Sequence, residues 1–203
     1  KNNKNLFMID TNSKKVSTLR TKDTPTQLKT TYNSISEIQD FEYDLLFGHR
    51  RLSIIDLSIL GHQPMVVNDL IITFNGEVYN YIELKNLLKT KGYKFKSKSD
   101  TEVIAVSYLH WGKECFKKFN GMWSMIIYDL RKNSIIISND RFGVKPLYFY
   151  KTDQSYILAS EIKQFHSFKK IELNLNIENL RVFLNNGYLD FDNSTFFNEI
   201  KRY

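Results

Sequence analysis

Two neighbouring residues near the middle of the sequence could donate hydrogen bonds to a single oxygen atom. Asn75 offers a side-chain amide, and Gly76 offers a backbone N–H with no side chain in its way. Both follow a β-branched and aromatic run, 71–74, which has the composition of a buried strand. Such donors can stabilise the negative oxygen that forms when a nucleophile attacks a carbonyl group. The Asn-Gly pair is also the commonest turn signal, so we expect the chain to change direction at Asn75.

A second run with side chains suited to binding is 45–55, which has strand composition and carries Arg50 and Arg51. Because side chains alternate along a strand, the two arginines should point to opposite faces, with Arg51 on the face of Phe47 and His49. One arginine would then be a surface charge and the other a contact for an anion.

An acidic side chain stands at the start of a predicted helix. The Ser-Asp-Thr-Glu run at 99–102 begins a helical pattern that ends at Gly112, with Asp100 at or near the N-cap. The Asp100 carboxylate could bond the free N–H groups of the first helical turn, or it could belong to a binding site.

The single cysteine, Cys115, lies in a run that predicts a half-buried helical position. No neighbouring base is evident, so we expect Cys115 to pack like a small hydrophobic residue rather than to act as a nucleophile. One cysteine cannot form an intrachain disulfide, which agrees with a reducing compartment. With no apolar run near the roughly eighteen residues that span a bilayer and no signal-peptide pattern at the start, the sequence predicts a cytoplasmic protein without membrane contact.

The remaining elements follow from periodicity and turn signals. A helix from Tyr81 should begin with a capping pair, Asn80 and Glu83, and should bury a stripe of apolar residues. That stripe consists of Tyr81, Leu84, Leu87 and Leu88. Gly92 should end this helix, and a short strand is expected at 93–95.

The second half of the sequence predicts mainly strands. They are expected at 122–129, 134–139, 147–150 and 156–159. A short helix should begin at 160–163, and another, at 177–185, should stop near Gly187. The hairpin-length link 130–133 favours antiparallel pairing, and 139–146 is a charged loop that could be structural or line a site. Before residue 43 the only predicted strand is 6–9, and 11–36 is expected to be loop with at most one helical turn. Strands flanked by helices predict two antiparallel sheets covered by helices, in one domain over 1–203.

The net charge of +7 is concentrated at the start of the chain. Residues 1–35 hold seven Lys or Arg and two acids, and a second basic cluster follows at 85–98. No nucleic-acid-binding motif accompanies either cluster, so a solvated surface is the favoured interpretation and nucleic acid is an unlikely partner. Aromatic content of 14% and charged content of 25% are typical of a folded protein.

Taken together, six motifs in one order resemble the glutaminase domain of asparagine synthetases, the class II glutamine amidotransferases. They are Gly-His-Arg-Arg-Leu-Ser-Ile at 48–54, Phe-Asn-Gly-Glu-Val-Tyr-Asn at 74–80, Ser-Asp-Thr-Glu at 99–102, Phe-Asn-Gly-Met-Trp at 119–123, Asp-Arg-Phe-Gly-Val-Lys-Pro-Leu-Tyr at 140–148 and Ala-Ser-Glu-Ile-Lys at 159–163. The resemblance runs from about residue 45 to 203, with 1–43 divergent. It implies an α+β fold, the four-layer αββα sandwich of two antiparallel sheets found in N-terminal-nucleophile hydrolases.

The resemblance also implies a site for L-glutamine. In that family a cysteine thiol attacks the glutamine side-chain amide, its own α-amine serves as base, and glutamate and ammonia are the products. Asn75 and Gly76 would form the oxyanion hole, Arg51 would bind the α-carboxylate and Asp100 the α-ammonium group. Backbone groups at Leu52, Ser53, Ile54, Ile55 and Glu77 would complete the pocket. No metal site is implied.

The family pattern is incomplete in this sequence. The nucleophile position would fall near Asn2 or Asn3, and the sequence has no cysteine there. The Arg-Gly-Pro-Asp segment of the family is replaced by Arg-Thr-Lys-Asp at 20–23. The C-terminal synthetase domain, which uses ATP and Mg²⁺, is also absent, so we expect no cofactor in this chain.

Two hypotheses follow for function. The first is the amidotransferase part of a glutamine-hydrolysing asparagine synthetase, a ligase of asparagine biosynthesis. It would release ammonia for amide formation on aspartate if a cysteine nucleophile is supplied, with a synthetase domain or subunit as partner. The alternative is a degenerate, non-catalytic domain, a pseudoenzyme that serves ligand binding or a structural role. Enzyme activity and assembly into a homo-oligomer are open at this point.

Overall fold

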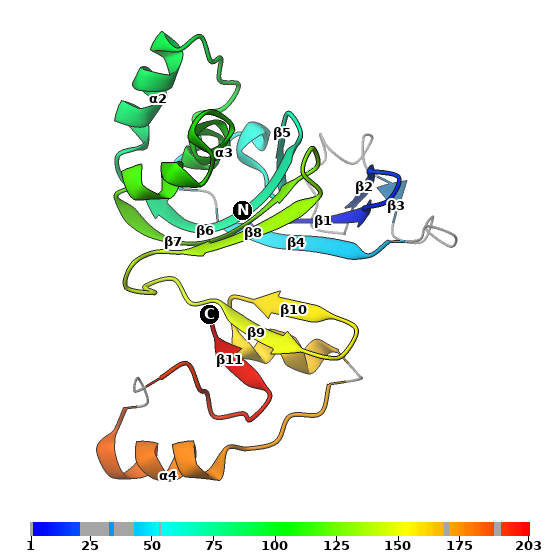
Figure 1. The fold of residues 1–203 in the computed structure, drawn as a ribbon, viewed down its shortest axis with the longest axis vertical. Coiled ribbons are helices and arrows are strands. Elements are labelled where there is room, and N and C mark those ends of the chain that lie inside the picture. The colour runs from blue at the N-terminus through cyan, green and yellow to red at the C-terminus, as the bar shows by residue number, and fades with distance from the viewer. Residues whose placement is uncertain (1, 21–32, 35–42, 53, 169–170, 189–191) are drawn as a thin grey trace. The chain divides into compact units, whose positions relative to one another are not determined.

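The structure is a computed structural model that describes residues 2–20, 33–34, 43–52, 54–168, 171–188 and 192–203 (Figure 1). The chain forms two compact units. Unit 1 comprises Lys1–Gly121 and Met125–Ser138, and unit 2 comprises Met122–Ser124 and Asn139–Tyr203. The count of one domain over 1–203 stays a prediction.

The first sheet of unit 1 has the strand order β3-β2-β1-β4. Its strands are β1 (Asn2–Asp10), β2 (Lys15–Arg20), β3 (Asn33–Ser34) and β4 (Leu45–Leu52). β1 pairs antiparallel with both neighbours, while β3 pairs parallel with β2. The predicted strand at 6–9 is confirmed as part of β1. The prediction of loop was wrong at β2, whose polar sequence becomes a strand because β1 supplies a hydrogen-bonding edge.

The register between β1 and β4 places the first residues of the chain beside the arginine pair. Asn3 lies opposite Arg51, and Asn2 lies opposite Leu52. The positions to which the resemblance assigns the nucleophile are therefore backbone neighbours of the predicted carboxylate contact.

The second sheet of unit 1 has the strand order β5-β6-β7-β8. Its strands are β5 (Met65–Val67), β6 (Leu70–Val78), β7 (Gly121–Asp129) and β8 (Ser134–Asn139). β5 pairs antiparallel with β6. β7 and β8 are hydrogen-bonded neighbours, and a four-residue link can join them only as an antiparallel hairpin. The predicted hairpin is thus confirmed, with strand ends at or within a residue of those expected.

The prediction that the chain changes direction at Asn75 was wrong. β6 continues through Asn75 and Gly76 to Val78, with φ of 150° at Gly76. The pairing partner β7 is supplied from more than 40 residues away, so a local turn signal could not reveal it. Gly121 allows β7 to approach, because a Cβ at this position would overlap the carbonyl oxygen of Glu77 and lie 3.0 Å from Val78 Cα.

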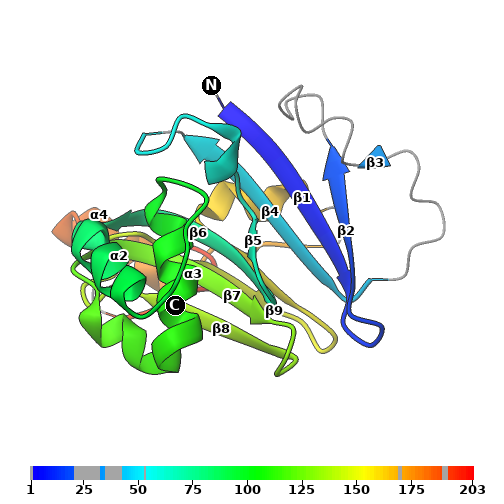
Figure 2. The same ribbon diagram turned by 90° about the horizontal axis from the view of Figure 1, so that it is seen from above.

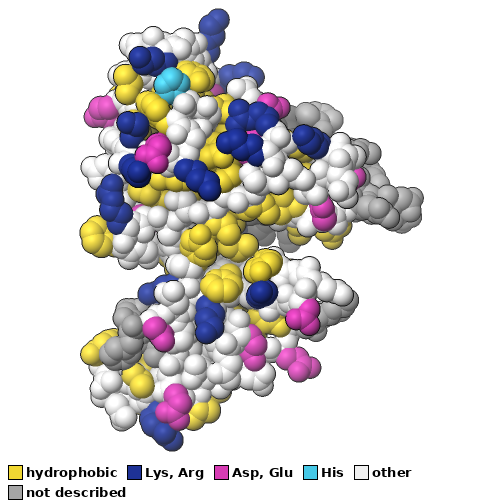
Figure 3. All heavy atoms as spheres, viewed as in Figure 1, with side chains coloured by type: hydrophobic (Ala, Val, Ile, Leu, Met, Phe, Trp, Pro, Cys, Tyr) yellow, Lys and Arg dark blue, Asp and Glu magenta, His cyan; other side chains and the backbone are white. Residues whose placement is uncertain are grey.

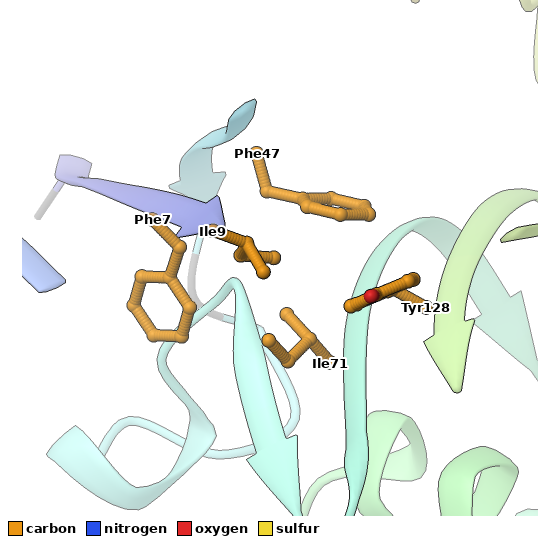
Figure 4. Packing of buried hydrophobic residues seen from close by; sticks show 5 residues of the cluster. All are labelled: Phe7, Ile9, Phe47, Ile71 and Tyr128. Carbon is orange, nitrogen blue, oxygen red and sulfur yellow. The ribbon is translucent and has the colours of Figure 1, made fainter. Parts of the chain in front are cut away.

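A hydrophobic core lies between the two sheets of unit 1. Phe7 and Ile9 of β1 and Phe47 of β4 pack with Ile71 of β6 and Tyr128 of β7 (Figure 4). Since alternate residues of a strand share a face, the opposite face of β6 carries Leu70, Ile72 and Phe74, which are also buried.

Helices cover this second face of the β5–β8 sheet (Figure 2). They are α2 (Tyr81–Thr90) and α3 (Asp100–Trp111), followed by a 3₁₀ helix, η3 (Gly112–Lys118). The two predicted helices, one beginning at Tyr81 and one between 99 and 112, are confirmed. In α3, however, every residue from 100 to 108 is buried rather than a single stripe.

Two details around α2 differ from the predictions. Asn80 makes no side-chain capping bond; its amide instead donates to Lys118 O over 2.9 Å and accepts from Asn120 N over 3.0 Å. Within the predicted stripe, Leu84 and Leu88 are buried but Leu87 is exposed. Residues 93–95 form no strand, because the chain there folds back on α2 through a bond from Tyr93 N to Leu88 O.

Unit 2 contains a three-stranded antiparallel sheet with the order β10-β9-β11. Its strands are β9 (Tyr148–Lys151), β10 (Tyr156–Ala159) and β11 (Ile200–Arg202). The helices are η4 (Ile162–Ser167), a 3₁₀ helix, and α4 (Ile177–Asn186), which ends at Gly187 as expected. Ala159, Phe165 and Ile200 form the core of this unit.

The loop at 139–146 is organised by one carboxylate. Asp140 accepts backbone hydrogen bonds from Phe142, Val144, Lys145 and Trp123. Burial would raise the pKa of Asp140, but these bonds outweigh it and hold the pKa below its ordinary value. This contact set supports the structural interpretation of the loop.

Two surface properties bear on partners. Among the described residues, no helix is long and apolar enough to cross a membrane. On the face shown in Figure 3, Lys and Arg side chains lie in several separate groups among acidic and uncharged ones. The basic side chains of the cluster at 1–35 lie mostly outside what the structure describes. In the cluster at 85–98, Lys89, Lys91, Lys94, Lys96 and Lys98 are exposed, which agrees with the solvated-surface interpretation.

Candidate functional site

Arg51 is a buried charged residue of unit 1. The burial pattern of β4 alternates as predicted, so that Phe47 and Arg51 are buried whereas Arg50 is exposed. Only 6% of Arg51 is exposed. Arg50 is therefore the surface charge of the pair, and Arg51 points into the structure.

The Arg51 guanidinium is held by the loop that follows β4. It donates to the carbonyl oxygen of Ser58 over 3.1 Å and to that of Asp56. Gly61 leaves room for the group, since a Cβ there would overlap Arg51 Nη2 and lie 2.9 Å from Cζ. These two bonds use two of the five guanidinium N–H donors, and a planar fork retains geometry suited to a carboxylate.

Asp100 lies at the start of α3, one residue after the N-cap. Ser99 is the N-cap and accepts from Thr101 N. The Asp100 carboxylate also interacts with backbone N–H groups of the first helical turn, and it accepts a bond from Val78 N over 3.2 Å, at the end of β6. Burial raises the pKa of Asp100, and the bond from Val78 opposes the rise.

Arg51 and Asp100 act on each other electrostatically. Burial lowers the pKa of Arg51 from its ordinary value, and the negative charges of Asp56 and Asp100 counteract this. The structure thus brings together a buried cation and a buried carboxylate that are 49 positions apart in the sequence.

His49 connects the strand of Arg51 to the strand of Asn75. Its Nδ1 lies 3.1 Å from Thr73 Oγ1. Because alternate residues share a strand face, Arg51 is on the face of β4 that His49 occupies, and Asn75 is on the face of β6 that Thr73 occupies. Burial, with the nearby charge of Arg51, lowers the pKa of His49 to about 4, so the imidazole is neutral at physiological pH.

Asn75 and Gly76 lie within β6 rather than beyond its end. Asn75 is exposed, and Gly76 is half-buried. On a strand paired with β5 and β7, a side-chain amide and a backbone N–H are held on a rigid element, as an oxyanion hole requires. Their role in catalysis stays a prediction.

The other predicted pocket residues lie around these. Leu52 ends β4, and the chain bends at Ile54 and Ile55, so the strand is shorter than the run 45–55 suggested. Leu52 and Ile54 are exposed, and Ile55 and Glu77 are half-buried. Ser53 lies outside the described residues.

Three buried polar residues that support the site were missed at the sequence level. Asp56 accepts from Ser58 N and Lys98 N, each over 2.8 Å. Gln63 accepts from Phe74 N over 2.6 Å and donates to Thr101 Oγ1 over 3.3 Å. Glu102 accepts from the backbone of 96–97. For Asp56, a charged residue inside an apolar run was the available signal, but its partner Lys98 is 42 positions away in the sequence.

Cys115 is excluded as the nucleophile by its surroundings. The side chain is fully buried, and burial raises its pKa to about 12. Its thiolate is therefore scarce at neutral pH. Among the described residues, no group of three or more His, Cys, Asp or Glu side chains could hold a metal ion.

Comparison with known proteins identifies the same family as the motifs. Residues 9–203 match the family model described as "Glutamine amidotransferase domain". The chain is 37% identical over 177 residues to a putative asparagine synthetase [glutamine-hydrolyzing] 2 of Methanocaldococcus jannaschii, which covers 78% of this chain. It is 44% identical over 119 residues to asparagine synthetase [glutamine-hydrolyzing] 1 of Bacillus subtilis, which covers 58% of this chain. The chain spans only 34% and 19% of these two relatives.

Solved structures give the fold. A glutamine phosphoribosylpyrophosphate amidotransferase from B. subtilis superposes with a TM-score of 0.64 at 22% identity, covering 80% of this chain and 36% of that protein. The predicted α+β sandwich is confirmed by this likeness. Since the family model matches almost the whole sequence, the chain belongs to the glutamine amidotransferase domain family.

Proposed function

We propose that this domain binds L-glutamine and, with a cysteine thiol at the catalytic position, hydrolyses its side-chain amide. The observation that carries the proposal is the pair of buried charges, Arg51 and Asp100. A free amino acid presents a carboxylate and an ammonium group on one carbon, and an arginine fork with an aspartate is the complementary pair. Both residues are about 95% buried, so their attraction for ligand charges is weakly screened.

The proposed reaction is the one that the family resemblance implies. The thiolate attacks the amide carbon, and the oxygen that becomes negative accepts hydrogen bonds from the Asn75 side chain and the Gly76 N–H. The C–N bond then breaks, a proton passes to the nitrogen, and ammonia leaves. Water hydrolyses the remaining thioester to glutamate and regenerates the thiol. The residues of this chain bind and orient the glutamine and stabilise the negative charge on its amide oxygen.

The register of β1 supports a nucleophile beside Arg51. The residues opposite Arg51 and Leu52 are Asn3 and Asn2. A cysteine at the start of β1 would stand next to the residue that binds the α-carboxylate.

The names of the relatives suggest where the ammonia goes. We propose that it passes to a synthetase domain or subunit that forms asparagine from aspartate. ATP and Mg²⁺ would belong to that partner, not to this domain. A cytoplasmic location and a homo-oligomeric assembly stay predictions.

The proposal is tested by supplying the nucleophile. Two variants would begin with cysteine in place of Asn2 or Asn3, each as the first residue of the chain. We expect at least one to release glutamate and ammonia from L-glutamine, and Asn75→Ala in that background to lower kcat by about 10²-fold. Serine at the same position is the matched control. If both cysteine variants bind glutamine but neither hydrolyses it, the proposed chemistry is wrong.

A further inference from the structure

We infer that Asp56 is a positioning residue that fixes the spacing between Arg51 and Asp100 and thereby makes the site selective for α-amino acids. The inference rests on the proposed function, because it concerns how the two charges act on one ligand.

The main chain of Asp56 holds Arg51. Its carbonyl oxygen accepts a hydrogen bond from the guanidinium, and the carbonyl of Ser58 accepts a second one over 3.1 Å. Asp56 Oδ1 in turn accepts from Ser58 N over 2.8 Å, which fixes the turn that presents both carbonyls. A change at the Asp56 carboxylate therefore reaches the Arg51 guanidinium through this turn.

The side chain of Asp56 also binds the backbone segment that precedes Asp100. Oδ2 accepts from Lys98 N over 2.8 Å, across 42 positions of sequence. Lys98 directly precedes the N-cap Ser99, and Asp100 is the first residue of α3. One side chain thus joins the loop that orients the cation to the loop that orients the carboxylate.

The surroundings of Asp56 make this link rigid. The residue is 5% exposed, so water is a poor substitute for its hydrogen bonds. Burial would raise the pKa of Asp56, but bonds from Ser58 and Lys98 and the charge of Arg51 outweigh burial and lower the pKa. The ionised carboxylate accepts both N–H groups, whereas an amide at this position would present a donor to one of them.

Selectivity follows from spacing. A ligand gains from both charges only if its carboxylate and ammonium group reach Arg51 and Asp100 together. If the two loops move independently, each charge still attracts a ligand, but the additional gain from the second contact falls. Loss of the link should therefore weaken the binding of a ligand with both groups more than it weakens the binding of a ligand with the carboxylate alone.

The experiment compares two ligands by titration calorimetry on the chain as it exists. The ligands are L-glutamine and glutaramic acid, which is glutamine without the α-ammonium group. We expect the wild-type chain to prefer L-glutamine by about tenfold or more, as for a charged hydrogen bond. We expect Asp56→Asn to reduce that preference to about threefold or less. Asp56→Ser, which keeps one acceptor, is the second variant in case Asp56→Asn fails to fold.

Asp140→Asn is the matched control. Asp140 is also a buried carboxylate that accepts several backbone bonds, but it organises the loop of unit 2. We expect the Asp140→Asn variant to prefer L-glutamine over glutaramic acid by the same factor as the wild type. An unchanged preference in folded Asp56→Asn or Asp56→Ser would overturn the inference alone. Failure of the wild-type chain to bind L-glutamine would overturn the proposed function and the inference with it.

Discussion

The carboxylate of Asp100 accepts a hydrogen bond from the backbone N–H of Val78 over 3.2 Å. Val78 ends β6 and lies two residues after Gly76. The group proposed to bind the ammonium end of glutamine is therefore attached directly to the strand that carries the proposed oxyanion donors. This contact between α3 and β6 links the two ends of the proposed substrate site.

Gly61 should be intolerant of a side chain because Arg51 occupies the adjacent space. We expect Gly61→Ala to lower the free energy of unfolding by about 1–3 kcal/mol, the usual cost of overpacking. L-glutamine affinity should fall as well, because the guanidinium must move. Urea unfolding and calorimetry measure the two effects. Gly143→Ala is the control: its Cβ would meet nothing within 4 Å, and its positive φ should cost stability without changing glutamine affinity. Full glutamine affinity in Gly61→Ala would contradict the placement of Arg51.

His49 should make stability depend on pH. Its folded-state pKa is about 4, below the ordinary value of 6.5, so the unfolded chain binds a proton first as the pH falls. The contribution of His49 is fully present above pH 6.5 and is lost as the pH falls toward 4, by at most about 3 kcal/mol. Urea unfolding at pH 7 and pH 4.5 measures it. His49→Gln should show a smaller loss between these two pH values; an equal loss would mean that other groups are responsible.

Gln63 should stabilise the junction between β6 and α3. It accepts from Phe74 N, next to Asn75, and donates to Thr101, next to Asp100. We expect Gln63→Leu, which keeps similar volume but leaves the Phe74 N–H unbonded, to lower the free energy of unfolding by about 1–3 kcal/mol. Chemical denaturation checks this. A change below about 0.5 kcal/mol, within the usual range of surface substitutions, would show that the bridge is unimportant.

Cys115 should be inert in the folded protein. Its pKa of about 12 leaves almost no thiolate at pH 8, and the side chain is fully buried. We expect iodoacetamide to leave the native chain unmodified under conditions in which it labels the urea-unfolded chain, with mass spectrometry as the readout. In the variants that begin with cysteine in place of Asn2 or Asn3, Cys115→Ala should retain glutamine hydrolysis. Loss of hydrolysis in the folded variant would implicate Cys115 in the reaction.

The parts of the site that depend on local pattern could be predicted from the sequence. Strand alternation separated Arg50 from Arg51, and the helix start located Asp100. The Asn75-Gly76 motif was located, but its conformation was not, because a distant strand, β7, converts a turn signal into a continuous strand. The role of Asp56 was missed because its partner, Lys98, is fixed only by the packing of two loops.

The central claim is that Arg51 and Asp100 together bind L-glutamine, and calorimetric titration of L-glutamine into the chain tests it most directly. Arg51→Met keeps the apolar stem of the side chain, and Asp100→Asn keeps its shape, so each removes mainly one charge. We predict saturable binding by the wild-type chain and a loss of affinity of about tenfold or more in each folded variant. Absence of binding by the wild type, or unchanged affinity in both variants, would contradict the account.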